Sequence, residues 1–231
     1  MVEFNGVDLE TAVSGIMIED IRVNPPQLAP MARARGIQAG SEFVRTRDET
    51  RTITITFAIL EKDGAARQAK LDALTEWACI GEVHPMALPY RDGRLIDVTC
   101  TMLPQPSTRQ WWESKLGITF TAFEPYFYAA TEKTAACGTA FTVGGTVPPI
   151  MWITDTLASA AARTYSDGTN TMTFSSVRAG NLVIDLNRQT AAVGGVSVLG
   201  SLSYTSKFIE PKAGTLTITG SGTVHYKERW R

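Results

Sequence analysis

The sequence predicts a mainly β protein with two domains: an N-terminal β-rich domain with one packed α-helix, and a C-terminal antiparallel β-sandwich. In the first half, apolar and polar residues alternate along several segments, as they do in half-buried strands. One segment there, residues 63–80, has helical spacing instead. In the second half, short apolar runs alternate with Gly, Asn, Asp and Ser, a pattern typical of short strands joined by tight turns.

The first domain contains one predicted helix and several predicted strands. Asp63 is suited to cap the helix, because its carboxylate can accept hydrogen bonds from free first-turn amides, and Gly81 is suited to end it. In the strand that precedes the helix, isoleucine and phenylalanine alternate with threonine, so one face is expected to be buried. The predicted strands lie between residues 4 and 24 and at 51–60, 95–103 and 117–123.

The first domain is expected to end at a proline. Glu124-Pro125 stops the last strand, because proline lacks the amide hydrogen that a sheet requires. Three aromatic residues follow, and then a run of small residues too poor in bulky side chains to build a core. We therefore predict an N-terminal domain over residues 1–130, a linker over 131–145 and a sandwich over 146–231.

Turn residues divide the second half into short apolar runs. Asp167-Gly168 and Gly194-Gly195 are typical turn pairs, and no helical pattern competes with the strands between them. The predicted strands are residues 150–153, 171–174, 182–186, 190–193, 216–218 and 224–226.

Composition excludes several classes of function. The chain has 231 residues, 44% of them hydrophobic and 19% charged, which suffices for two folded domains. A net charge of −1 argues against nucleic-acid recognition, which favours a basic excess. No apolar run approaches the roughly 20 residues that span a bilayer, and the acidic N-terminus does not resemble a signal peptide. We expect neither membrane insertion nor a signal peptide.

Catalysis is not predicted. The chain has two histidines, His84 and His225, and neither lies near a nucleophile or metal-binding motif. The three cysteines, Cys79, Cys100 and Cys137, are far apart and lack the paired spacing of a metal site, so we expect reduced thiols. We expect a protein that is not an enzyme and has no metal or cofactor.

The segment from Leu28 to Arg47 is rich in arginine and poor in apolar residues, and we expect a long loop there. Arginine is favoured at interfaces because its guanidinium binds carboxylates through two hydrogen bonds, although a solvated loop has a similar composition. A second copy of the protein would supply acids of the first domain, Glu61, Asp63, Asp72 and Glu76. The candidate interface residues are Arg33, Arg35, Arg45, Arg47 and Arg51.

Three residues of the second half are candidates for contact with a sugar or a docked protein: Trp152, Arg163 and Asn181. Exposed tryptophan stacks on sugar rings. Trp152, however, lies between Met151 and Ile153, and a tryptophan in that setting is more often part of a core. Because the three candidates are scattered along the chain, we expect a docking role for this domain rather than sugar binding.

Several short strings, in order along nearly the whole chain, resemble the distal tail (Dit) proteins of long-tailed bacteriophages. The resemblance begins with an "FNG" opening and continues through an alternating strand and a strand that ends in an aromatic cluster. The strings are Glu3–Gly6 (EFNG), Arg51–Phe57 (RTITITF), Gly117–Tyr128 (GITFTAFEPYFY), Pro149–Thr154 (PIMWIT), Gly180–Leu186 (GNLVIDL) and His225–Arg231 (HYKERWR).

This resemblance implies a structural virion protein at the tail tip or baseplate of a siphophage. Dit proteins form a hexameric ring, a hub that joins the tail tube to the proteins that meet the host. The resemblance also implies a galectin-like C-terminal sandwich and a place for the arginine-rich segment at the ring's subunit contacts. The implied partners are further copies of the chain, the tail tube protein, a tail-tip hub protein, and receptor-binding or fibre proteins.

Two other interpretations stay open. The chain would be a carbohydrate-binding adhesion module of a tail if the sandwich alone bound glycans. It would be another self-assembling tail component, such as a tube subunit, if it stacked into long polymers instead of stopping at one or two rings.

Overall fold

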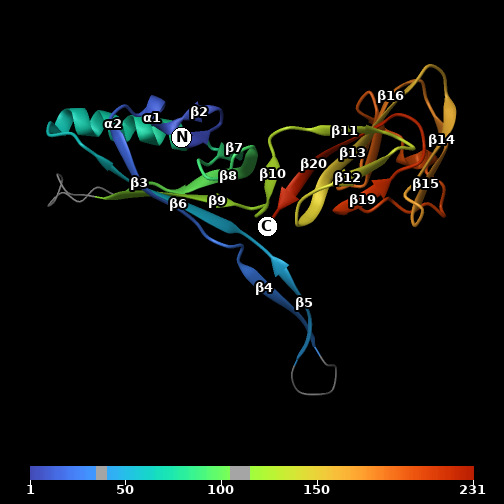
Figure 1. Cartoon of the computed structure of the whole chain (residues 1–231), viewed down its shortest axis with the longest axis horizontal. Helices are drawn as coiled ribbons and strands as arrows, with labels where there is room; N and C mark the ends of the chain where they lie inside the picture. The colour runs from blue at the N-terminus through green and yellow to red at the C-terminus, as the bar shows by residue number, and fades with distance from the viewer. Residues whose placement is uncertain (35–40, 105–114) are drawn as a thin grey trace. The chain divides into compact units, whose positions relative to one another are not determined.

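The computed structural model describes residues 1–34, 41–104 and 115–231. The chain divides into two compact units, Met1–Phe127 together with Arg231, and Tyr128–Trp230 (Figure 1). Each unit has its own core of buried apolar side chains. Strands predominate in both units and the longest helix lies in the first, which confirms the predicted mainly β class.

The first unit is built on an antiparallel sheet. Its strands are β1 (Glu3–Phe4), β2 (Val7–Asp8), β3 (Ile16–Val23), β6 (Arg51–Ile59), β7 (His84–Ala87), β8 (Arg94–Met102) and β9 (Leu116–Ala122), and its helices are α1 (Leu9–Ala12) and α2 (Gly64–Ala78). The strand order is β3-β6-β9-β8-β7-β1-β2. Every second residue of β6 and β9 is buried, as their alternation predicts.

The helix α2 supplies apolar side chains to the same core as β6 and β9. Leu74 and Trp77 of α2 belong to the buried cluster that contains Phe57 and Phe120. Asp63 caps the helix, since its Oδ2 accepts a hydrogen bond of 2.8 Å from the Ala66 amide. The predicted helix and its cap are therefore confirmed.

The described residues of the segment that we expected to be a loop, 28–34 and 41–47, are strands. They belong to two paired antiparallel strands, β4 (Leu28–Ala34) and β5 (Ser41–Asp48), which we call the arm. Figure 1 shows the arm leaving the sheet on the side opposite α1 and α2. Leu28 is 57% exposed and Phe43 63%, so the described side chains of the arm form no buried face, and a strand pair without one lacks the periodic apolar signal of a strand.

The second unit is a two-layered antiparallel sandwich. The strand β10 (Phe127–Ala129) begins at the last residue of the first unit and continues into the second. The other elements of the second unit are β11 (Lys133–Ala136), β12 (Ala140–Val143), β13 (Val147–Leu157), β14 (Ala161–Ser166), β15 (Thr171–Val177), β16 (Gly180–Asp185), β17 (Thr190–Val193), β18 (Val196–Ser197), the 3₁₀-helix η1 (Leu199–Ser201), β19 (Gly214–Thr217) and β20 (Thr223–Trp230). One layer has the order β18-β17-β16-β13-β20, with β11 also on β20. The pairs β14-β15 and β12-β19 contribute buried residues from the other side of the core.

The predicted linker over residues 131–145 is wrong. Strands β11 and β12 lie within it and pair with β20 and β19 of the second unit. Phe141 and Val143 are buried in that unit's core, while the small residues around them are exposed. Two apolar side chains thus suffice to anchor a segment whose average composition resembles a linker.

Candidate subunit-interface site

The strand pairing of the arm places three of the candidate arginines on one face. Arg45 lies opposite Met31, and Arg47 opposite Ala29. Arg33 follows Met31 by two residues on β4 and therefore points to the same side. All three arginines are exposed. We call this surface, Arg33, Arg45 and Arg47 with Met31, the basic face of the arm.

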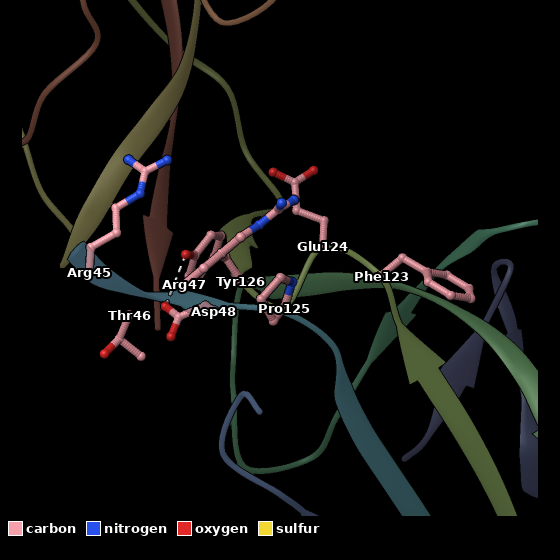
Figure 2. A pocket seen from close by; sticks show the side chains of 8 residues that line it. All are labelled: Arg45, Thr46, Arg47, Asp48, Phe123, Glu124, Pro125 and Tyr126. Carbon is pink, nitrogen blue, oxygen red and sulfur yellow. Dashed lines mark hydrogen bonds between the residues drawn. The ribbon is translucent and has the colours of Figure 1, made fainter. Parts of the chain in front are cut away.

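A hollow of about 600 Å³ lies where the arm joins the sheet, and we call it the arm root. In Figure 2, the side chains of Arg45 and Arg47 project to one side of β5, and those of Thr46 and Asp48 to the other. The residues that line the hollow are Arg45, Thr46, Arg47, Asp48, Phe123, Glu124, Pro125 and Tyr126.

Asp48 fixes the base of the arm. Its Oδ2 accepts a hydrogen bond of 3.0 Å from the Tyr126 hydroxyl, and its Oδ1 lies 2.5 Å from Nη2 of Arg231. The Asp48 side chain is only 11% exposed. Both carboxylate oxygens are thus engaged away from the basic face.

Two arginines of the basic face have no acidic partner within the described part of the chain. Arg45 donates from Nε to the Met31 sulfur at 3.5 Å, a weak contact, and no ion pair joins Arg45 or Arg47 to a described carboxylate. An exposed guanidinium offers five donors in a fork that fits carboxylates. The basic face therefore has unused capacity for an acidic partner.

Arg51 does not belong to this face, which corrects our prediction for it. It is the first residue of β6, shares the inward face with Ile53, and is 3% exposed. Its guanidinium lies over the Phe127 ring at 5.0 Å. Burial lowers the pKa of Arg51, and the Arg91 cation lowers it further. The candidate Arg35 lies outside the described residues.

The three candidates of the second unit are not brought together. Trp152 is half-buried on the outer face of β13 and stacks on His225 with 5.4 Å between ring centroids, so the core position that we favoured is wrong. Asn181 lies opposite Thr156, four residues farther along β13, or about 13 Å away. Arg163 pairs at 2.7 Å with Asp155, whose side chain faces the core. Trp152, Asn181 and Arg163 thus form no common platform for a sugar.

Sequence reasoning missed the polar cluster around Asp155. This buried carboxylate accepts hydrogen bonds from Arg163 (2.7 Å), Tyr165 (2.9 Å) and Ser221 (2.5 Å). Burial opposes its ionisation, but the three hydrogen bonds outweigh burial and lower the pKa of Asp155. Arg163 and Tyr165 lie on β14 and Ser221 lies between β19 and β20, far from Asp155 in the sequence, so no local motif marks the cluster. It cross-links the sandwich.

The cysteines are unpaired, and burial raises the pKa of the Cys100 thiol to about 11, so this thiol is unreactive at neutral pH. In the described ranges, no group of three or more His, Cys, Asp or Glu side chains is placed to hold a metal ion. Within those ranges, no helix has the length and apolar character needed to cross a membrane.

Comparison with solved structures defines the class of fold: the chain has the fold of a phage tail hub protein over its whole length. The particular match is the crystal structure of the Dit protein (gp 19.1) of phage SPP1, described as a paradigm of the hub adsorption apparatus in phages that infect Gram-positive bacteria. The TM-score is 0.78 at 12% sequence identity, with 100% of this chain and 98% of that chain covered.

Two further matches are more distant. The phage P2 baseplate in its activated conformation, solved with calcium and with strontium, matches at a TM-score of 0.43 and 10% identity, covering 93% of this chain and 91% of that chain. No protein-family model and no curated protein sequence matches the chain. The match to the SPP1 Dit fold confirms the predicted resemblance to Dit proteins.

Proposed function

We propose that this chain is a structural hub protein of a phage tail, which assembles with copies of itself into a ring, of six subunits by analogy with Dit proteins. The ring would join the tail tube to tail-tip or baseplate proteins and to receptor-binding or fibre proteins. Its role would be to bind and position these partners, without catalysis, in the assembled virion.

One observation carries the proposal: a chain with the complete fold of SPP1 Dit also has an arm that its own described residues leave uncovered. The arm presents Arg45 and Arg47 without acidic partners and the apolar side chains Leu28 and Phe43 in water. Exposed apolar and arginine side chains together are typical of protein interfaces. A contact between an arm and a different surface of another copy is head-to-tail, and repetition of such a contact gives a ring when the rotation between subunits closes and an open filament when it does not.

The test is the mass of the purified chain in solution, measured by light scattering, with negative-stain imaging of the same sample. We expect closed rings of about six subunits with a central channel. Long tubes would contradict the hub and favour a tube subunit. A monomer at every concentration would contradict self-assembly.

A further inference from the structure

If the arm binds another copy of the chain, that copy must supply a receiving surface, and the described residues offer a candidate of complementary chemistry. A groove of about 330 Å³ lies beside α1 and α2. Trp77 and Phe4, both nearly buried, line it together with the more exposed Val7 and Ile80. It has room for one long apolar side chain, and Glu76 is the charged residue among its lining side chains.

Glu76 is the acid of α2 that is left available. Glu61 already pairs with Lys70 at 3.1 Å, and Asp63 caps the helix. Asp72 accepts a hydrogen bond of 2.9 Å from Gln68. Glu76 is exposed, and no hydrogen bond or ion pair joins it to another described residue. Of the four acids that the sequence offered, the structure leaves this one for a partner.

The two surfaces match in layout as well as in charge. On the arm, the flexible apolar side chain of Met31 lies beside the Arg45 guanidinium, with 3.5 Å between Sδ and Nε. Glu76 lies in the last turn of α2, Ile80 follows the end of that helix, and both side chains line the groove. Methionine adapts well to irregular apolar grooves, so Met31 can fill the groove while Arg45 reaches Glu76.

The arm and the groove of one chain point apart. The arm leaves the sheet opposite the layer of α1 and α2 (Figure 1). We infer that the arm of one subunit docks on the α1–α2 groove of a second copy of this chain, with Met31 in the groove and Arg45 paired with Glu76. This inference rests on the proposed self-assembly and names the surface that receives the arm.

The first test is a charge exchange, measured by light scattering on the full chain. Arg45→Glu and Glu76→Arg should each weaken association roughly tenfold or more, because each places like charges together. The double variant restores opposite charges and should recover most of the association. Both residues are exposed, so thermal unfolding should match that of the wild type. Lys212→Glu and Glu210→Arg, exposed in the second unit, are matched controls and should associate normally.

The second test is a cross-link that detects even brief contacts. Cys79 is exposed next to Ile80, so a short bismaleimide should join it to Met31→Cys of another chain. The same variant with Cys79→Ser is the control and should give no product.

The outcomes separate this inference from the proposed function. Wild-type rings together with normal association of Glu76→Arg, or with a double variant no better than the single ones, would overturn the groove and leave the ring intact. A monomeric wild type would contradict the ring. The cross-link would then test the docking by itself: a cross-linked product would support the contact between arm and groove, and the lack of a product would overturn it.

Discussion

Arginine serves opposite purposes in the two units. In the second unit, Arg163 is held by the buried Asp155 at 2.7 Å, within a cluster that Tyr165 and Ser221 complete. In the arm of the first unit, Arg45 and Arg47 extend into solvent without an acidic partner among the described residues. The surroundings of an arginine, rather than its presence in an arginine-rich segment, therefore decide whether its loss affects folding or association.

The largest effect on the free energy of unfolding is expected at the buried carboxylate of Asp155. Asp155→Ala removes the acceptor of three hydrogen bonds and leaves the Arg163 cation uncompensated, at a cost of about 3–5 kcal/mol in the free energy of unfolding. Urea denaturation measures the loss. Glu210→Ala, at an exposed position, is the control and should change stability by less than about 0.5 kcal/mol. Equal stability of both variants would mean that the cluster does not hold the sandwich together.

The same cluster should give stability a dependence on acid. The pKa of Asp155 is lower in the folded chain than the ordinary carboxyl value of about 4. Its ionised form therefore stabilises the fold above that value, and the contribution is lost as the pH falls through the lowered pKa. Unfolding measured between neutral pH and pH 2 should show the loss. Asp155→Asn should flatten the profile only in part, because the hydrogen bond from Lys133 also lowers the pKa of Glu228.

A carboxylate with a single, exposed hydrogen bond should have an intermediate effect. Asp63 accepts one bond from the Ala66 amide at the start of α2. Asp63→Ala should lower the free energy of unfolding by about 1 kcal/mol, while Asp63→Asn, which can still cap the helix, should lower it less. Thermal unfolding of both variants checks this order. Equal losses would show that the charge, rather than the cap, stabilises this helix end.

The sequence predicted the elements whose apolar faces are buried. Apolar and polar residues alternate along β6 and β9 because one face of each strand, which includes Phe57 and Phe120, lies in the core. The start of α2 was predictable from its capping residue. The apolar side chains described on the arm are exposed, so its strands were predicted as a loop. β11 and β12 were read as a linker because their anchors, Phe141 and Val143, are few.

The candidate site was predictable in part. The sequence indicated the arginines of the arm because the segment is rich in arginine. The strand pairing of β4 and β5 then placed Arg33, Arg45 and Arg47 on one face. The arm root was not predictable, because Asp48 contacts Arg231, 183 positions away in the sequence. The burial of Arg51 depends on the Phe127 ring above it, which also lies far along the chain.

The smallest effect on the free energy of unfolding is expected for a substitution on the arm, which we compare with a matched substitution at a buried arginine. Arg47→Met removes an exposed cation and should change the free energy of unfolding by less than about 0.5 kcal/mol. It should nevertheless weaken association, and added salt should weaken the association of the wild type in the same direction, since exposed charges are screened.

Arg51→Met is the counterpart. The sequence grouped Arg51 with Arg47 as an interface candidate, but the Arg51 side chain is buried. Its Nε has no hydrogen-bond partner, so an apolar side chain there removes a buried, unsatisfied donor along with the charge. We expect Arg51→Met to associate as the wild type does while its unfolding changes. Light scattering measures the association of both variants. Equal impairment of the two would contradict the idea that only arginines on the basic face take part in the interface.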